Sequence, residues 1–146
     1  MPLQEGSFAP DFSLKSTDGS TVQLSRFRGK KNAVVYFYPK DDTPGCTKEA
    51  CGFRDDISQL LAKDAVVFGV STDNLDSHNA FSRKFSLNFP LLSDPDGAVS
   101  KAYEAFNPEK GTSRRVTAIV DKEGKIKKYF AQVNPEGHSR EILSIL

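Results

Sequence analysis

The two cysteines of this chain lie five residues apart in the segment "TPGCTKEAC", residues 43–51. They are Cys46 and Cys51, and they follow an apolar run that ends at Pro39. Thiols bind metals, form disulfides or act as nucleophiles, and a pair in a reducing compartment is more often catalytic, redox-active or incidental than a structural bridge. The spacing and the flanking residues therefore have to indicate which chemistry applies.

The residues before Cys46 predict that its thiol lies at the start of a helix. Thr43 is a preferred N-cap residue, Pro44 fits the first helical position, and Gly45 follows. Cys46 then falls in the first turn, where unpaired backbone N–H groups and the positive end of the helix dipole stabilise a thiolate. A free cysteine is also a common small core residue, so position alone leaves a purely structural Cys46 open.

Helix geometry restricts how Cys46 and Cys51 could react with each other. Five helical positions correspond to roughly 140° of rotation and about 7.5 Å of rise, which puts the two Cα atoms roughly 8 to 9 Å apart. A disulfide requires a Cα separation of about 4.4 to 6.8 Å. If the two thiols form a disulfide, the helix must therefore lose its first turns.

Other uses of the two thiols fit the sequence less well. A zinc site would need further ligands, but His78 and His138 lack ligand spacing; we expect them on an exposed helix face and at a helix start, respectively. A thioredoxin-like exchange site would have only two residues between its cysteines. We therefore predict no metal, and the interpretation that fits best is a Cys46 that is oxidised and a Cys51 that then attacks it.

The rest of the chain predicts one α/β domain, residues 1–146, with a mixed sheet and helices on both of its faces. Two apolar runs, 32–38 and 65–71, predict buried central strands on either side of the cysteine helix, joined by a right-handed connection. The other expected elements are a hairpin turning at Asp18-Gly19, a helix over 76–86 capped by Asp76, an extended segment over 89–94, a helix over 96–106, a hairpin turning at Glu123-Gly124 and a helix from near Pro135.

Composition excludes some classes of partner. The net charge of +1 provides no basic excess for a nucleic acid or an anionic membrane. No apolar run is long enough to span a bilayer, and the segment "MPLQEGSFAPDF" lacks the pattern of a secretory signal. We expect a cytoplasmic protein, although a processed organellar form would have the same sequence features.

The segment "FYPKDDTPGCTKEAC" resembles the active site of the peroxiredoxins, whose pattern P-x-x-x-T-x-x-C falls on Pro39, Thr43 and Cys46. A second cysteine five residues on is similar to the bacterioferritin-comigratory subgroup, also called peroxiredoxin Q. The segments "FAPDFSL", "VVFGVSTD", "FPLLSDPDG" and "RRVTAIVD" resemble the family in the same order. The resemblance therefore covers nearly the whole chain.

This resemblance implies a thioredoxin-like fold and a thiol-dependent peroxidase for hydrogen peroxide and organic hydroperoxides. Cys46 corresponds to the peroxidatic cysteine, Cys51 to the resolving cysteine, Thr43 to the substrate-activating threonine and Arg115 to the active-site arginine. Arg114 is expected to point to the other face, because side chains alternate along a strand. The implied partners are a peroxide and a thioredoxin or similar dithiol, with no metal, flavin or haem. Resolution within one chain favours a monomer.

A stabilised thiolate alone does not make a peroxidase, because nucleophilicity falls as the thiolate becomes more stable. Charge that develops on the peroxide oxygens calls for fixed donors, which we expect to be the Thr43 hydroxyl, backbone N–H groups near Gly45 and Cys46, and the Arg115 guanidinium. The residues expected to bind substrate are thus Pro39, Thr43, Gly45 and Arg115, whereas Asp41, Asp42 and Glu49 are expected at solvated positions.

Two alternatives stay open at the level of sequence. A redox sensor or thiol-relay protein would share the chemistry of Cys46 and differ only in what reduces the disulfide. A non-catalytic α/β binding module with incidental thiols would leave Thr43 and Arg115 unexplained as a set.

Overall fold

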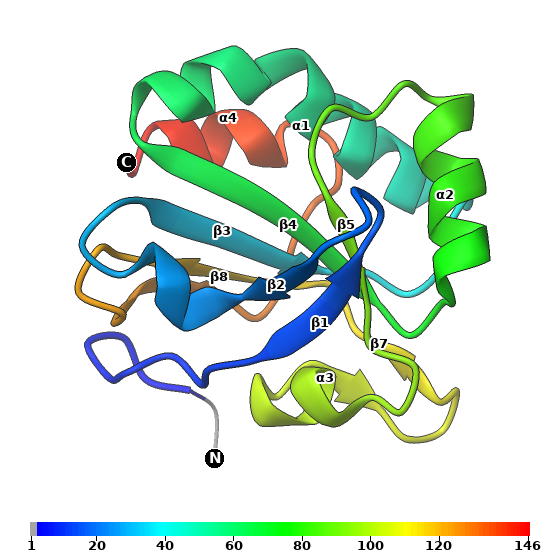
Figure 1. Ribbon diagram of the computed structural model, residues 1–146, viewed down its shortest axis with the longest axis horizontal. Helices are drawn as coiled ribbons and strands as arrows, with labels where there is room; N and C mark the ends of the chain where they lie inside the picture. The colour runs from blue at the N-terminus through cyan, green and yellow to red at the C-terminus, as the bar shows by residue number, and fades with distance from the viewer. Residues whose placement is uncertain (1–2) are drawn as a thin grey trace.

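The computed structural model describes residues 3–146, and its centre is a seven-stranded mixed sheet with the order β2-β1-β5-β4-β3-β8-β9 (Figure 1). Its strands are β1 (Ser13–Ser16), β2 (Thr21–Gln23), β3 (Asn32–Phe37), β4 (Ala65–Ser71), β5 (Leu91–Ser93), β8 (Val116–Val120) and β9 (Ile126–Phe130). The other elements are the separate β6 (Phe106–Asn107) and β7 (Thr112–Ser113), a 3-10 helix η1 (Leu24–Phe27), and the helices α1 (Pro44–Ala62), α2 (Leu75–Lys84), α3 (Ala98–Ala102) and α4 (His138–Leu143).

The two strands that flank the cysteine helix form the middle of the sheet. β3 pairs with β4 in parallel, from Asn32 opposite Ala65 to Phe37 opposite Val70, and it pairs with β8 in the antiparallel direction. Residues 33–37 are buried on both faces, as their apolar and β-branched composition predicts. The predicted central strands are confirmed, and β4 has the predicted bounds.

Helices cover both faces of the sheet. The sheet separates two hydrophobic cores, and side chains of β3 point alternately into them. Val34 and Tyr36 belong to the first cluster, and Val35 and Phe37 belong to the second. The first cluster includes residues of α1, α2 and α4, and the second includes Phe12 and residues 103 and 105, just beyond α3. Figure 1 shows α1 and α4 together above the sheet and α3 below it. The mixed α/β fold predicted from the sequence is therefore confirmed.

Several predicted boundaries are wrong by a few residues. Asn74, not Asp76, is the N-cap of α2, and its side chain accepts a hydrogen bond from the Ser77 backbone N–H at 2.8 Å. α4 begins at His138 rather than near Pro135. Both hairpins form as predicted, β1 with β2 and β8 with β9. No helix of the described residues combines the length and apolar character needed to cross a membrane.

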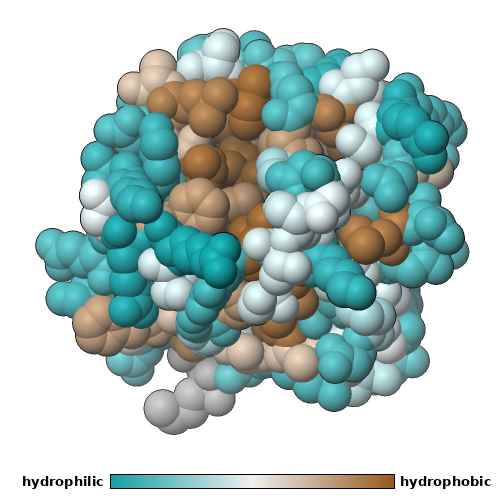
Figure 2. Space-filling model, viewed as in Figure 1, coloured by the Kyte–Doolittle hydropathy of each residue, from teal (hydrophilic) through white to brown (hydrophobic). Residues whose placement is uncertain are grey.

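Apolar surface gathers in a hollow between α1 and the β1–β2 hairpin, on the face shown in Figure 2. Its apolar lining includes Phe27, Ile57, Leu61, Val66 and Phe89. Cys46 does not line this hollow. The thiol site and the apolar hollow are therefore different regions of the molecule.

Candidate active site

Cys46 lies in the first turn of α1, as predicted. Thr43 is the N-cap with an extended backbone, Pro44 is the first helical residue, and the Thr47 N–H donates to the Thr43 carbonyl at 2.8 Å. Cys46 is 1% exposed, so its sulfur faces the interior rather than bulk water. A thiol in this place is surrounded by the unpaired N–H groups of the helix start.

The Thr43 side chain does not cap the helix. Its hydroxyl instead donates to the Lys40 carbonyl at 2.9 Å, and a carbonyl oxygen only accepts. A hydroxyl has one hydrogen, so in this geometry Thr43 Oγ1 is left as an acceptor. The expectation that Thr43 donates to the peroxide does not fit this arrangement, in which Thr43 Oγ1 can only accept a further hydrogen bond.

Arg115 brings two donors to this helix from a distant strand. It directly precedes β8, whose first residue Val116 lies opposite Phe37, the last residue of β3. Its Nη2 donates to Cys46 Sγ at 3.4 Å, and its Nη1 donates to Glu49 Oε1 at 2.8 Å. Arg114 points away and donates to the Glu104 carbonyl. The prediction that the side chains of Arg114 and Arg115 point to opposite faces thus agrees with the structure.

Glu49 is buried at the site, and its expected solvated position is wrong. It is 1% exposed because it lies three residues after Cys46, on the helix face that also buries Ala50 and Phe53, where Arg115 supplies its partner. The spacing of residues 46, 49, 50 and 53 was a signal for this burial. A carboxyl group next to the Cys46 thiol was therefore missed by reading Glu49 only as a charged residue.

Burial raises the pKa of Glu49 from 4.5 to about 7, because the loss of water outweighs the nearby Arg115 guanidinium. Its Oε2 has no hydrogen-bond partner among the residues that the structure describes. Arg115 therefore serves two groups, a buried carboxyl and the thiol of Cys46. The carboxyl holds the guanidinium, and the second arm of the guanidinium faces the sulfur.

Gly45 makes room for this arginine. A Cβ atom at residue 45 would lie 3.0 Å from Arg115 Nη2 and 3.6 Å from Pro135 Cγ. Pro135, in the segment before α4, was not predicted to approach the site, and no local pattern indicates it. The absence of a side chain at residue 45 therefore allows Arg115 to reach the helix start.

Cys51 lies on the same continuous helix as Cys46. Both thiols are free, Cys46 is buried, and Cys51 is half-buried. This arrangement is the one for which helix geometry excludes a direct disulfide. Pro39 is half-buried in the loop between β3 and α1, and Asp42 in that loop is exposed, as predicted.

Two further predictions of exposure are wrong. Asp41 is 8% exposed and His78 is 0% exposed, and the two side chains contact each other at 2.7 Å. The signal for His78 was its spacing to Phe81 and Phe85, since residues three and seven apart share a helix face. His138 starts α4 as predicted, but its ring is also buried, with Nε2 at 2.8 Å from Thr117 Oγ1.

Comparison with known proteins agrees with these features. The AhpC/TSA family matches residues 6–129. The chain is 41% identical to "Putative peroxiredoxin bcp" of Coxiella burnetii, with both chains fully covered, and 40% identical to "Peroxiredoxin Bcp" of Bacillus subtilis, covering 100% of this chain and 96% of that one. It is 44% identical to "Peroxiredoxin Q, chloroplastic" of Triticum aestivum, covering 99% and 67%. A solved structure of the Xanthomonas campestris bacterioferritin comigratory protein matches with a TM-score of 0.88 at 30% identity, covering 97% and 96%.

Proposed function

We propose, from the premise that this chain belongs to the AhpC/TSA family, that Cys46 is the sulfur with which it reduces peroxides. The chain is a thiol-dependent peroxidase, since relatives that align with at least 99% of it are peroxiredoxins of the Bcp and Q types. The finer proposal concerns which residues act and in what order. The observation that carries it is the Arg115 guanidinium, whose Nη2 lies 3.4 Å from Cys46 Sγ.

In the first step, the Cys46 thiolate attacks the O–H oxygen of ROOH. The S–O bond forms, the O–O bond breaks, and the products are Cys46 sulfenic acid and RO⁻, which takes up a proton to become ROH. Arg115 lies where its charge offsets the charge that moves from sulfur to the leaving oxygen. Thr43 Oγ1 is free to accept the hydrogen of the peroxide O–H group, because its own hydrogen is directed to the Lys40 carbonyl.

In the second step, Cys51 attacks the sulfur of Cys46 sulfenic acid, releasing water and closing a disulfide. The helix that holds both residues must unwind at its first turns for this bond to form. An external dithiol, which we propose to be a thioredoxin, then reduces the disulfide and returns the thiols. This cycle requires a reducing compartment, such as the cytoplasm, and it needs no second subunit.

The test is the rate of peroxide consumption by the purified protein with thioredoxin, thioredoxin reductase and NADPH. Cys46→Ser should abolish the reaction, because a neutral hydroxyl provides no nucleophile comparable to a thiolate. Cys51→Ser should not turn over with thioredoxin: one equivalent of peroxide converts its Cys46 to sulfenic acid and a second equivalent converts that to sulfinic acid, and mass spectrometry detects both products.

Peroxide turnover by Cys46→Ser would remove Cys46 as the nucleophile, and thioredoxin-driven turnover by Cys51→Ser would remove Cys51 from the cycle. A wild-type protein that is oxidised by peroxide but not reduced by thioredoxin would instead support a sensor or relay. In that case the oxidised protein is incubated with other dithiol proteins, such as glutaredoxin, to find which one reduces it.

A further inference from the structure

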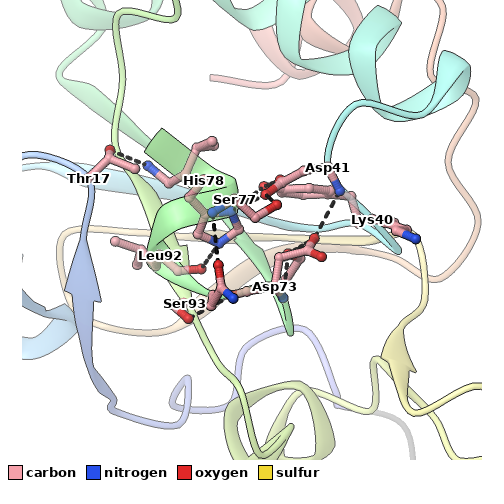
Figure 3. Close-up of polar contacts among 12 residues, drawn as sticks. Thr17, Lys40, Asp41, Asp73, Ser77, His78, Leu92 and Ser93 are labelled. Atoms are coloured by element: carbon pink, nitrogen blue, oxygen red, sulfur yellow. Dashed lines mark hydrogen bonds and ion pairs between the residues drawn. The ribbon is translucent and has the colours of Figure 1, made fainter. Parts of the chain in front are cut away.

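A buried cluster of polar side chains around Asp41 fixes the loop between β3 and α1. The Asp41 carboxylate accepts hydrogen bonds from Tyr38 Oη at 2.6 Å and from Ser77 Oγ at 2.8 Å, and its Oδ2 lies 2.7 Å from His78 Nδ1. Ser77 and His78 belong to α2, whereas Asp41 lies between β3 and α1. Figure 3 shows the side chains of Asp41, Ser77 and His78 pointing toward one another. The cluster therefore joins two segments nearly 40 residues apart in sequence.

The hydrogen bonds of His78 determine where one proton lies. Its Nε2 is 2.9 Å from the Leu92 carbonyl, which only accepts, so Nε2 carries a hydrogen. Its Nδ1 faces a carboxylate oxygen at 2.7 Å, and two acceptors at this distance require a proton between them. The pair of His78 and Asp41 thus holds one shared proton, in a place where His78 is 0% exposed.

The cluster is a set of completed hydrogen bonds rather than an open ligand set. One atom each of Asp41, Asp73 and His78 lie within 4.8 Å of one another, as metal ligands would. However, both nitrogens of His78 already have partners, and Asp73 Oδ2 accepts from Ser71 Oγ at 2.7 Å and from the Asp41 backbone N–H at 2.9 Å. These contacts hold both the side chain and the backbone of Asp41.

Asp41 directly follows Lys40, whose carbonyl orients the Thr43 hydroxyl. The Lys40 carbonyl, which accepts the Thr43 hydroxyl at 2.9 Å, belongs to the same peptide unit as the Asp41 N–H. A peptide unit is planar, so holding the Asp41 N–H on Asp73 also fixes the direction of the Lys40 carbonyl. The direction of the Lys40 carbonyl in turn determines whether the Thr43 hydroxyl donates its hydrogen to that carbonyl, which leaves the Thr43 oxygen as an acceptor.

We infer that His78 is a positioning residue for peroxide reduction. It holds Asp41, the peptide unit of Lys40 and Asp41 keeps the Thr43 hydrogen engaged, and Thr43 Oγ1 is thereby kept as an acceptor for the peroxide O–H. The inference rests on the proposed roles of Cys46 and Thr43. It separates recognition of the peroxide, which depends on this chain of contacts, from the reactivity of the Cys46 thiol, which depends on Arg115 and the helix start.

The experiment compares two reactions of Cys46 in a Cys51→Ser background, where it is the only thiol. Oxidation by hydrogen peroxide and alkylation by iodoacetamide are each followed by acid quench and mass spectrometry. His78→Gln places its amide near the position of Nε2 and loses the contact to Asp41, so its peroxide rate constant should fall at least about tenfold while alkylation stays within about twofold. His78→Asn places an amide near the position of Nδ1 and should recover the peroxide rate to within about threefold.

Tyr103→Phe is the matched control, because it removes a different buried hydrogen bond, from Tyr103 Oη to the Pro10 carbonyl at 2.6 Å, in the other core cluster. It should lower stability and leave both rates unchanged. If His78→Gln does not fold, Ser77→Ala removes one donor to Asp41 and should show the same selective loss at a smaller scale.

An unchanged peroxide rate in His78→Gln overturns the inference. An equal loss in both reactions also overturns it, because it indicates a loosened site rather than lost recognition of peroxide. A parent protein whose Cys46 is alkylated but not oxidised by peroxide would instead contradict the proposed function itself.

Discussion

The first two turns of α1 and the rest of that helix are stabilised by different kinds of contact. Residues 44–51 carry both cysteines and a glycine, and their buried contacts include the ion pair of Glu49 with Arg115. From Phe53 onward the buried face is apolar: the Phe53 ring is 0% exposed, stacks on Tyr36 at 4.6 Å between centroids, and packs edge-on against His138 at 6.0 Å. The helix is thus anchored at one end by packing and at the other by charge.

This difference bears on the disulfide that we propose between Cys46 and Cys51. A hydrogen bond contributes a net of about 1 kcal/mol to stability, whereas burying a large apolar side chain such as Phe contributes about 1.5 to 3 kcal/mol. On this proposal, the first turns unwind to form the disulfide while the remaining turns stay docked on the sheet. The four predictions that follow test this difference between the two halves.

Phe53→Ala should lower the free energy of unfolding by about 3 to 5 kcal/mol, because it leaves a cavity among Tyr36, Phe89 and His138. Urea denaturation of the reduced protein measures this loss. Leu61→Ala is the control on the same helix, since Leu61 is 48% exposed and its replacement should cost less than about 0.5 kcal/mol. Similar losses in both variants would mean that packing does not anchor this half.

Formation of the disulfide should speed amide exchange in residues 44–51 at least about a hundredfold, equal to about 3 kcal/mol, while residues 53–62 and β4 keep their protection. Hydrogen exchange with mass spectrometry on reduced and oxidised protein measures this. Peroxide-treated Cys51→Ser cannot close the bond and should keep the protection of the reduced protein. Equal exchange in both states of the wild type, with the disulfide present, would show that the helix does not open.

Glu49→Gln should flatten the dependence of stability on pH. Because the folded protein raises the pKa of Glu49 from 4.5 to about 7, this group's contribution is complete below about pH 4.5 and is lost as the pH rises through about 7. The wild type should thus lose about 2 to 3 kcal/mol between pH 4.5 and pH 8 through this group, and the variant should not. Urea titrations across that range provide the test; Glu123→Gln, at an exposed position, should keep the wild-type slope.

Arg115→Lys should lower the second-order rate constant for peroxide at least about tenfold, equal to about 1.4 kcal/mol, with little change in stability. A single ammonium cannot reproduce the planar fork that contacts both Glu49 and Cys46. Acid-quenched time courses of the reaction with hydrogen peroxide measure this rate constant. Arg114→Lys is the control, since the Arg114 side chain donates to the Glu104 carbonyl and not to Cys46. A loss of rate in that variant instead would reverse the assignment.

The sequence predicted those features that depend on neighbours along the chain. The strands at 32–38 and 65–71, both hairpins and the position of Cys46 after Thr43, Pro44 and Gly45 all follow from local patterns of burial, turns and caps. The choice of Arg115 over Arg114 followed from strand alternation and resemblance to a family. These inferences needed no knowledge of which segments meet in space.

The buried polar residues could not be predicted in the same way. Glu49, Asp41 and His78 look like surface residues, because a charged side chain is buried only when a partner meets it, and the partner comes from another element. Arg115 lies 66 residues after Glu49, and His78 lies 37 residues after Asp41. Helical spacing to apolar neighbours was the available signal for Glu49 and His78, and Asp41 offered none.

The contact between Gly45 and Arg115 limits which sequences this site can accept. Gly45 is needed for space rather than for its backbone angles, because any Cβ there would lie 3.0 Å from Arg115 Nη2, closer than nearly all Cβ contacts in proteins. Any larger residue at position 45 therefore requires the Arg115 guanidinium to shift away from the start of α1. On its other side the same position has ordinary van der Waals room, because Pro135 Cγ lies 3.6 Å away.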